Sequence, residues 1–319
     1  MGIARVRGEK MKLISIVTPC YNEENNIREL YGKVKAIMTG LEDYRYEHIF
    51  IDNASTDRTV DILRESAQND KNLKVIVNTR NFGHIRSPYH AILQTQGDAV
   101  ISIVADLQDP PELIKEFVKK WESGFKIVVG VKKESRESKL FYTLRQLYYS
   151  TLVRLANVEL IEQFTGFGLY DREVINILRN LNEPYPYFRG LIAEIGLPRA
   201  SVEYLQPSRH RGITKNNFYT LLDIALLGLT SHSKVPLRLA VIVGFIAAVD
   251  SLAVALFYLV YKLLFWNSFT VGLAPLVVGI FFFSSVQLLF LGIVGEYVGS
   301  IHTYVQNRPL VVEKERINF

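Results

Sequence analysis

Three clusters of acidic and small polar residues are the strongest candidates for chemistry. They occupy residues 18–24 (TPCYNEE), 52–57 (DNASTD) and 106–111 (DLQDPP). Each follows a short run rich in β-branched or aromatic residues. One such cluster would be a weak signal, because these residue types also cap helices. Three of them, at the ends of successive predicted strands, indicate a shared ligand-binding site.

Alternating strand-like and helix-like segments position these clusters. Strands are expected at residues 13–19, 46–52, 74–78, 99–106 and 126–131, with helices at 24–38, 56–69, 83–96 and 111–123. Repeated βαβ units predict an α/β fold with a mainly parallel sheet and helices on both faces. Ligands of such a sheet bind beyond the carboxyl ends of the strands, which is where the clusters lie.

The composition favours an anionic partner and a membrane. The chain has 319 residues and is 49% hydrophobic, and the apolar excess gathers after Pro236. Its formal charge of +5 and isoelectric point near 9.1 suit nucleic acid, acidic lipid or a phosphorylated substrate. The basic residues cluster beside the apolar segments rather than along a recognition helix, so no nucleic-acid module is expected. The single cysteine, Cys20, cannot form an internal disulfide.

Two long apolar segments predict a membrane hairpin. Residues 239–261 are apolar apart from Asp250, and residues 271–294 contain no charged side chain. Each could cross a hydrocarbon core of about 30 Å, although two buried core helices would show the same pattern. Asp250 and Glu296 could contact passing lipid or join helices or subunits. Basic residues flank the hairpin on its outer sides, at positions 234, 238, 308, 314 and 316, which predicts that the large N-terminal domain and both termini are cytoplasmic.

The chain therefore divides into five predicted parts. They are a disordered basic tail (1–12), the α/β domain (13–215), an interfacial amphipathic helix (216–235), the hairpin (236–302) and a cytoplasmic tail (303–319). No long apolar run follows the basic N-terminal residues, so a cleaved signal peptide is not expected. A further apolar stripe at residues 140–155 fits either packing on the sheet or another subunit, or membrane contact.

The sequence resembles glycosyltransferase family 2, which has the GT-A fold. It is most similar to the polyisoprenyl-phosphate subgroup, which includes dolichol-phosphate mannose synthases and bacterial undecaprenyl-phosphate glucosyltransferases of the GtrB type. The resemblance covers almost the whole chain and rests on PCYNE (19–23), DNASTD (52–57), RNFG (80–83), DLQDPP (106–111), TGFGLYDR (165–172), RHRGITK (209–215), PLR (236–238) and RP (308–309).

The resemblance implies transfer of one sugar, glucose from UDP-glucose, to undecaprenyl phosphate with inversion. It also implies an integral membrane homo-oligomer, a tetramer. Two alternatives are a nucleotide-sugar-binding membrane protein with a degraded metal site and an enzyme of the dolichol-phosphate mannose synthase type that uses GDP-mannose. A processive polysaccharide synthase would carry a Gln-x-x-Arg-Trp motif, which neither Trp121 nor Trp266 completes.

Donor chemistry requires neutralisation of a leaving diphosphate, which Mg²⁺ or Mn²⁺ provides as a Lewis acid. Asp106 is the expected metal ligand, assisted by Gln108, whereas helix capping is the alternative for Asp106. A DxD-type motif would place a second acid at position 104, but Val104 stands there. Asp109 could compensate, although its Asp-Pro-Pro context more simply predicts a helix cap.

The remaining donor residues are carried over from the family. Asp52 is expected to hydrogen-bond the base, while Pro19, Tyr21 and Glu23 would surround the base and ribose. Tyr21 could instead be a packing residue. Glu162 lies before the reaction region and could bind a sugar hydroxyl, act as a base or be a solvated loop carboxylate.

The acceptor phosphate needs cationic partners. Arg209, Arg211 and Lys215 lie in one loop that leads to the membrane segments, and Arg189 is a further candidate for the same pocket. The same loop would also attract anionic lipid headgroups. A phosphate monoester is already ionised near neutral pH, so a strong general base is not required. The predicted catalytic set is therefore Asp106, Glu162 and Arg209.

Overall fold

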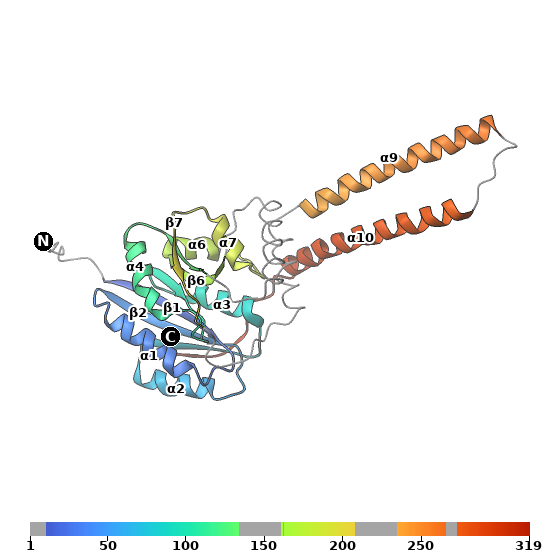
Figure 1. The fold of residues 1–319 in the computed structure, drawn as a ribbon. Coiled ribbons are helices and arrows are strands. Elements are labelled where there is room, and N and C mark those ends of the chain that lie inside the picture. Colours follow the sequence, from blue (N-terminus) through green and yellow to red (C-terminus); the bar gives the residue numbers. More distant parts are fainter. Residues whose placement is uncertain (1–10, 134–160, 162, 208–234, 266–272) are drawn as a thin grey trace.

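An eight-stranded sheet with helices on both faces forms the main domain, and two long helices extend away from it (Figure 1). The computed structural model describes residues 11–133, 161, 163–207, 235–265 and 273–319. The strands are β1 (Lys12–Cys20), β2 (Tyr44–Asp52), β3 (Leu73–Asn78), β4 (Ala99–Ser102), β5 (Ile127–Lys132), β6 (Phe164–Asp171), β7 (Arg199–Tyr204) and β8 (Glu313–Ile317). The helices are α1 (Ile27–Thr39), α2 (Thr59–Asn69), α3 (Gly83–Gln94), the 3-10 turn η1 (Pro111–Leu113), α4 (Ile114–Glu122), α6 (Arg172–Leu181), α7 (Phe188–Glu194), α9 (Val235–Leu264) and α10 (Leu273–Gln306).

The strand order is β7-β5-β6-β4-β1-β2-β3-β8. Strands β4, β1, β2 and β3 run parallel to one another, and β5 runs parallel to β7, whereas β6 and β8 are antiparallel to the strands beside them. Cys20 lies opposite Asp52, and Val17 lies opposite Ser102, so the loops after β1, β2 and β4 leave the same edge of the sheet. The expected α/β fold with a mainly parallel sheet is confirmed.

Amphipathic helices cover the two faces of this sheet. On one face, α1, α2 and α4 bury Leu30, Leu63 and Phe117 in one core cluster. On the other face, α3, α6 and α7 contribute to a second cluster through residues such as Tyr89 and Ile175. The sheet itself is almost fully buried between them, which explains the continuous apolar runs of its central strands.

Element boundaries differ from the sequence predictions mainly at β4. The strand was expected at residues 99–106, but it ends at Ser102. Beyond it the backbone turns, because Leu107 has a φ of 59° and the Asp109 carboxylate accepts a hydrogen bond from the Val104 N–H at 3.4 Å. Asp106 therefore lies in a turn past the sheet, not at the end of a strand.

Gly168 of β6 sits where the backbone leaves no room for a side chain. A Cβ atom there would collide with the carbonyl oxygen of Val128 in β5. We therefore expect Gly168→Ala to lower the free energy of unfolding by about 1–3 kcal/mol, because the two strands must separate. Gly32→Ala is the matched control, since the added methyl group meets nothing within 4 Å on α1 and should be neutral or stabilising. Thermal unfolding of both variants checks this, and equal unfolding temperatures would contradict it.

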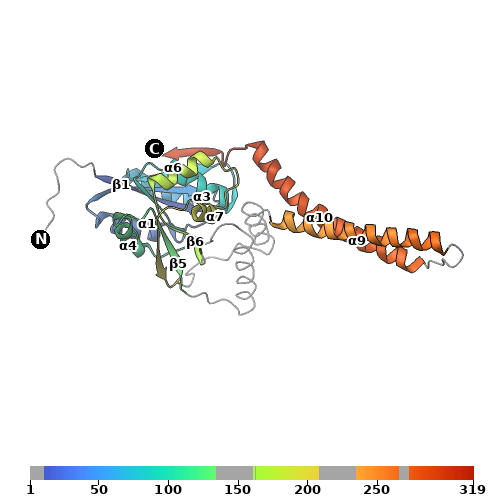
Figure 2. The ribbon, with the colours of Figure 1, turned by 90° about the horizontal axis from the view of Figure 1, so that it is seen from above.

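The C-terminal helices α9 and α10 run beside each other away from the sheet (Figure 2). Among the described residues, Gly279–Gln306 in α10 is long and apolar enough to cross a membrane, and none of its most apolar window is buried. In α9 the described residues give only a shorter apolar stretch, Leu239–Val254, within the helix Val235–Leu264. The predicted two-span hairpin is therefore not confirmed, although both helices exist and both carry their expected carboxylates, Asp250 and Glu296, on exposed positions.

The C-terminus returns to the sheet, which the sequence analysis did not anticipate. Residues 303–319 were expected to form a tail, but Glu313–Ile317 is strand β8, paired antiparallel with β3. Its alternating exposed positions explain why the apolar pattern of a strand is missing from the sequence. The basic N-terminal tail up to residue 10, the interfacial helix expected at 216–235 except its last residue, and the stripe at 140–155 lie outside the described residues.

Candidate active site

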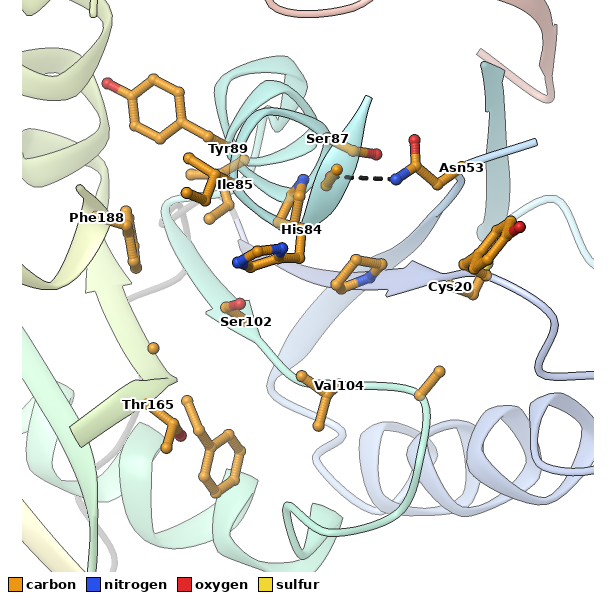
Figure 3. Close-up of a pocket in the computed structure, with 18 of the residues that line it drawn as sticks. Cys20, Asn53, His84, Ile85, Ser87, Tyr89, Ser102, Val104, Thr165 and Phe188 are labelled. Atoms are coloured by element: carbon orange, nitrogen blue, oxygen red, sulfur yellow. Dashed lines mark hydrogen bonds between the residues drawn. The ribbon is translucent and has the colours of Figure 1, made fainter. Parts of the chain in front are cut away.

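A cleft of about 730 Å³ opens at the carboxyl edge of the parallel strands. Its walls come from the loops after β1, β2 and β4, from the first half of α3, and from the starts of β6 and α7. Figure 3 shows His84 near the middle of the view, with Phe188 on one side and Asn53 on the other. The edge predicted from the three polar clusters is therefore the edge that carries the cleft.

Five of the predicted site residues line this cleft: Pro19, Tyr21, Glu23, Asp106 and Arg189. They come from the loop after β1, the turn after β4 and the start of α7, so the fold unites segments that lie far apart in the sequence. The cleft lining does not include Asp52 or Gln108. The predicted residues Glu162, Arg209, Arg211 and Lys215 lie outside the described part of the chain.

The turn after β4 holds Asp106 at the cleft. The Asp106 carboxylate accepts a hydrogen bond from the Gln108 N–H at 3.1 Å, which closes a short Asx turn around Leu107. Gln108 thus supports Asp106 through its backbone. Asp106 is half-buried, so its carboxylate is held in place while part of it remains open to solvent.

Asp109 is not a helix cap, contrary to the sequence interpretation. It is buried, and its carboxylate accepts hydrogen bonds from the Tyr204 hydroxyl at 3.0 Å and the Val104 N–H at 3.4 Å. Burial raises the pKa of Asp109 to about 6. The residue ties the turn to β7, and the η1 turn that follows begins without a side-chain cap.

The donor set of the cleft fits a metal ion that is shared with a bound diphosphate. Val104 lines the cleft, 38% exposed, at the position where a second acid would stand. Within the described residues no group of three or more His, Cys, Asp or Glu side chains could hold a metal by itself. One protein carboxylate completed by phosphate oxygens and water is an ordinary arrangement for Mg²⁺, so Asp106 suits a substrate-shared ion.

Asp52 stands behind the cleft and shapes the neighbouring loops. It is fully buried, which raises its pKa, and it accepts hydrogen bonds from both the hydroxyl and the N–H of Ser55. The Ser55 hydroxyl in turn accepts from the Asn22 N–H at 2.9 Å. The loops after β1 and β2 are thereby joined, which orders the segment that presents Tyr21 and Glu23 to the cleft.

Asn53 fixes the start of α3. The sequence analysis did not assign a function to this residue. Its side-chain amide donates to Asn81 Oδ1 at 2.8 Å and to the Gly83 carbonyl at 3.1 Å, and its Oδ1 accepts from the Phe82 N–H at 2.9 Å. This network joins the RNFG motif to the DNASTD motif. It also places His84 in the cleft. The sequence analysis did not assign His84 to the site, and its position directly after the RNFG motif was the signal that could have indicated it.

His84 projects into the cleft from the first turn of α3 (Figure 3). Partial desolvation by the surrounding walls, and then the positive charge of Arg189, lower its pKa. Arg189 lies with its guanidinium carbon 5.5 Å from the centre of the Tyr187 ring. The cleft therefore combines a carboxylate on the β4 turn with a basic pair on helices α3 and α7.

Comparison with known proteins shows the family to which the chain belongs. Residues 15–178 match the family model described as "Glycosyl transferase family 2". The chain belongs to glycosyl transferase family 2. The matched residues contain the three polar clusters and most of the residues that line the cleft. The α/β architecture agrees with the GT-A fold that the resemblance implied.

Relatives of this glycosyltransferase extend beyond the family match. The chain is 35% identical over 300 residues to the Bacillus subtilis glycosyltransferase YkcC, covering 93% of this chain and 92% of the relative. It is 33% identical over 303 residues to a bactoprenol glucosyl transferase of Shigella phage SfII, covering 95% and 97%. Among solved structures, the Pyrobaculum calidifontis mannosyltransferase PcManGT, in complex with GDP-Man and Mn²⁺, is 15% identical with a TM-score of 0.47, covering 92% of this chain and 86% of that chain.

Proposed function

We propose that this glycosyltransferase moves glucose from UDP-glucose to undecaprenyl phosphate, with inversion, at the cytoplasmic face of a membrane. The observation that carries the proposal is the similarity to bactoprenol glucosyl transferases over 95% of the chain, which includes α9 and α10 as well as the family 2 domain. Bactoprenol is a synonym of undecaprenol. Similarity that extends past the sugar-donor domain supports a shared lipid acceptor.

The proposed reaction is one displacement at the anomeric carbon. An oxygen of the acceptor phosphate forms the new bond while the bond to the nucleoside diphosphate breaks, and the diphosphate leaves with both bonding electrons. The acceptor oxygen is already anionic near neutral pH, so the step needs no strong base. Glu162 is retained as the proposed ligand of a sugar hydroxyl, or as a base.

Donor binding is assigned to the residues around the β1 and β4 loops. Pro19, Tyr21 and Glu23 would surround the base and ribose, and Asp52 would contact the base or, through Ser55, order that loop. Asp106, with Gln108, would hold Mg²⁺ or Mn²⁺, which as a Lewis acid neutralises the charge of the leaving diphosphate. The acceptor phosphate is assigned to Arg209, Arg211 and Lys215, with Arg189 on the cleft wall.

Val104 stands where a DxD-type motif would have a second acid, and restoring that acid gives a direct prediction. We expect Val104→Asp to lower the Mn²⁺ concentration that half-saturates the protein by severalfold, because two carboxylates attract a divalent cation more strongly than one. Mn²⁺ titration in the presence of UDP measures this. Val104→Asn, which adds a similar shape without charge, is the matched control. An unchanged half-saturation in the aspartate variant would show that the ion does not bind beside position 104.

Membrane placement completes the proposal. Helix α10 meets the α/β domain through the Tyr304 hydroxyl, which donates to the Glu183 carboxylate at 2.6 Å. Glu183 lies shortly before Pro186, where the segment that lines one wall of the cleft begins. This contact supports an α9–α10 hairpin that holds the cleft near lipid headgroups. A homo-oligomer, a tetramer, is part of the proposal.

A second reading is a nucleotide-sugar-binding membrane protein or an enzyme that uses GDP-mannose. The weak carboxylate set around Val104 favours the binding protein. The test incubates purified full-length protein with undecaprenyl phosphate vesicles and radiolabelled UDP-glucose, UDP-N-acetylglucosamine or GDP-mannose. We expect one labelled glucose per lipid in the organic phase. Labelling by GDP-mannose alone would support the mannose alternative. Nucleotide binding without any lipid product would refute the proposed transfer.

A further inference from the structure

Two basic side chains face the cleft from the helices that cover one side of the sheet. Among the described residues that line the cleft, His84 and Arg189 are the basic ones. His84 belongs to the first turn of α3 and Arg189 to the first turn of α7. Neither first turn contains an acidic residue, and α3 contains none at all. Arg189 therefore gives this wall a positive charge and His84 adds a hydrogen-bonding imidazole, unlike the turn that carries Asp106.

The two side chains line the same cleft from the starts of two helices that pack on the same face of the sheet. Arg189 lowers the pKa of His84 in addition to the effect of desolvation. Both effects favour the neutral imidazole, whose N–H can still donate a hydrogen bond. The Asn53 network that fixes the start of α3 holds His84 at the cleft.

A phosphate group matches this wall chemically. Arg donates two parallel hydrogen bonds to phosphate oxygens, and a histidine N–H donates a third. The positive end of the α3 dipole adds a favourable field for the same charge, although it would not define a site without the two side chains. A sugar hydroxyl would gain less, because it carries no charge for Arg189 to neutralise.

We propose that His84 and Arg189 form a phosphate-binding subsite in the cleft that Asp106 also lines. It takes up a phosphate group, which is either the diphosphate of the sugar donor or the monoester of the lipid acceptor. The inference rests on the proposed function, because that reaction supplies both phosphates. His84, in the first turn of α3, thus becomes a proposed phosphate ligand in addition to the basic residues of the loop 209–215 that the sequence indicates.

The test measures binding rather than turnover. Full-length protein in detergent is titrated by calorimetry with UDP in EDTA buffer, with farnesyl phosphate, and with farnesol as the matched ligand that lacks the phosphate. The variants are His84→Gln and Arg189→Gln. Lys115→Gln, which removes an exposed positive charge from α4, is the control. Thermal unfolding is recorded for each variant. If either loses its fold, His84→Asn or Arg189→Lys replaces it.

We expect both variants to raise the Kd of one phosphate ligand about tenfold or more, because each loses a charge-assisted hydrogen bond. Farnesol binding and the Lys115→Gln control should change less than about twofold. A loss for UDP assigns the subsite to the donor, and a loss for farnesyl phosphate assigns it to the acceptor. Unchanged Kd values for both phosphates, or an equal loss for farnesol, would overturn the proposal.

The same measurements separate this inference from the proposed function. If the wild-type protein forms no lipid-linked sugar but the variants still lose phosphate affinity, the subsite stands and the proposed transfer fails. If lipid-linked glucose forms and neither variant loses phosphate affinity, the transfer stands and the subsite fails.

Discussion

Asp106→Asn is expected to lower the rate of sugar transfer by on the order of 100-fold or more, with a smaller effect on nucleotide affinity. The asparagine keeps an oxygen that can accept the Gln108 N–H, so the turn around Leu107 should survive. What is lost is the negative charge that holds a divalent cation against the leaving diphosphate. Initial rates of lipid-linked glucose formation, measured across a range of Mn²⁺ concentrations, give the result.

The size of this effect follows from how few carboxylates the cleft offers. Asp109 cannot replace Asp106, because it is buried and already accepts from Tyr204 and the Val104 backbone. Glu23 belongs to a different loop and bonds the Asn26 side chain at 2.7 Å. Loss of Asp106 therefore removes the one carboxylate on the β4 turn that is held at the cleft and partly open to it.

A matched control for this prediction is Asp61→Asn. Asp61 is exposed on α2, outside the cleft, and pairs with Arg64 at 3.3 Å, so its loss should leave the rate of transfer within about twofold of wild type. Full activity in the Asp106→Asn variant, with unchanged metal dependence, would refute the metal role of this carboxylate. It would also shift the charge neutralisation to the basic wall of His84 and Arg189.

The sequence predicts the sheet and the edge that carries the cleft because the pattern that indicates each strand and its polar end lies within a few consecutive residues. Each parallel strand is a buried apolar run followed by a polar cluster, and the topology brings the cluster ends together whatever the loop details. The position of Asp106 was predicted less well. Its strand ends early because Asp109, three residues away, captures the Val104 N–H, and a side chain that bonds β7 as well cannot be inferred from local pattern.

His84 was missed for a related reason. Its neighbourhood, an α3 start held by Asn53 from the loop after β2, is set by hydrogen bonds between residues 28 and 30 positions apart. Asp52, which is expected to contact the base, is fully buried and accepts a hydrogen bond from the Ser55 N–H, and its contact with the base stays a prediction. In both cases the motif marked the correct region, while the contacts that decide which side chain faces the cleft are tertiary.

Strand β8 could not be predicted because its stabilising partners are distant. It has no apolar alternation, and its charged side chains bond residues more than 200 positions away: Glu313 pairs with His90 at 2.5 Å and Glu315 with Arg64 at 2.6 Å. The Asn318 amide donates to the carbonyls of Ala67, Asp70 and Leu73, which end α2 and begin β3. The chain beyond α10 thus pairs with β3 and becomes the edge strand of the sheet.

Deleting residues 313–319 is therefore expected to destabilise the α/β domain by about 2–4 kcal/mol and to lower its unfolding temperature by roughly 5–15 °C, because it removes a ladder of hydrogen bonds and several charge-assisted contacts. The exposed edge of β3 should also promote aggregation. Thermal unfolding and size-exclusion chromatography in detergent measure both effects. Lys314→Ala, which changes an exposed side chain on the same strand, is the control and should leave both unchanged.

The pH dependence of the stability lost on deleting residues 313–319 shows which contacts provide that stability. The Arg316 side chain, and then His90, lower the pKa of Glu313 from its ordinary value of 4.5. A carboxylate with a depressed folded pKa stabilises the fold above its unfolded pKa and loses that contribution as the pH falls through the folded value. The stability difference between the full chain and the truncated chain should therefore be largest near neutral pH and shrink below about pH 4. A difference that stayed constant down to pH 3 would assign the stabilisation to the backbone ladder alone. Because α10 leads directly into β8, either outcome also shows how firmly the apolar helix is attached to the domain that carries the cleft.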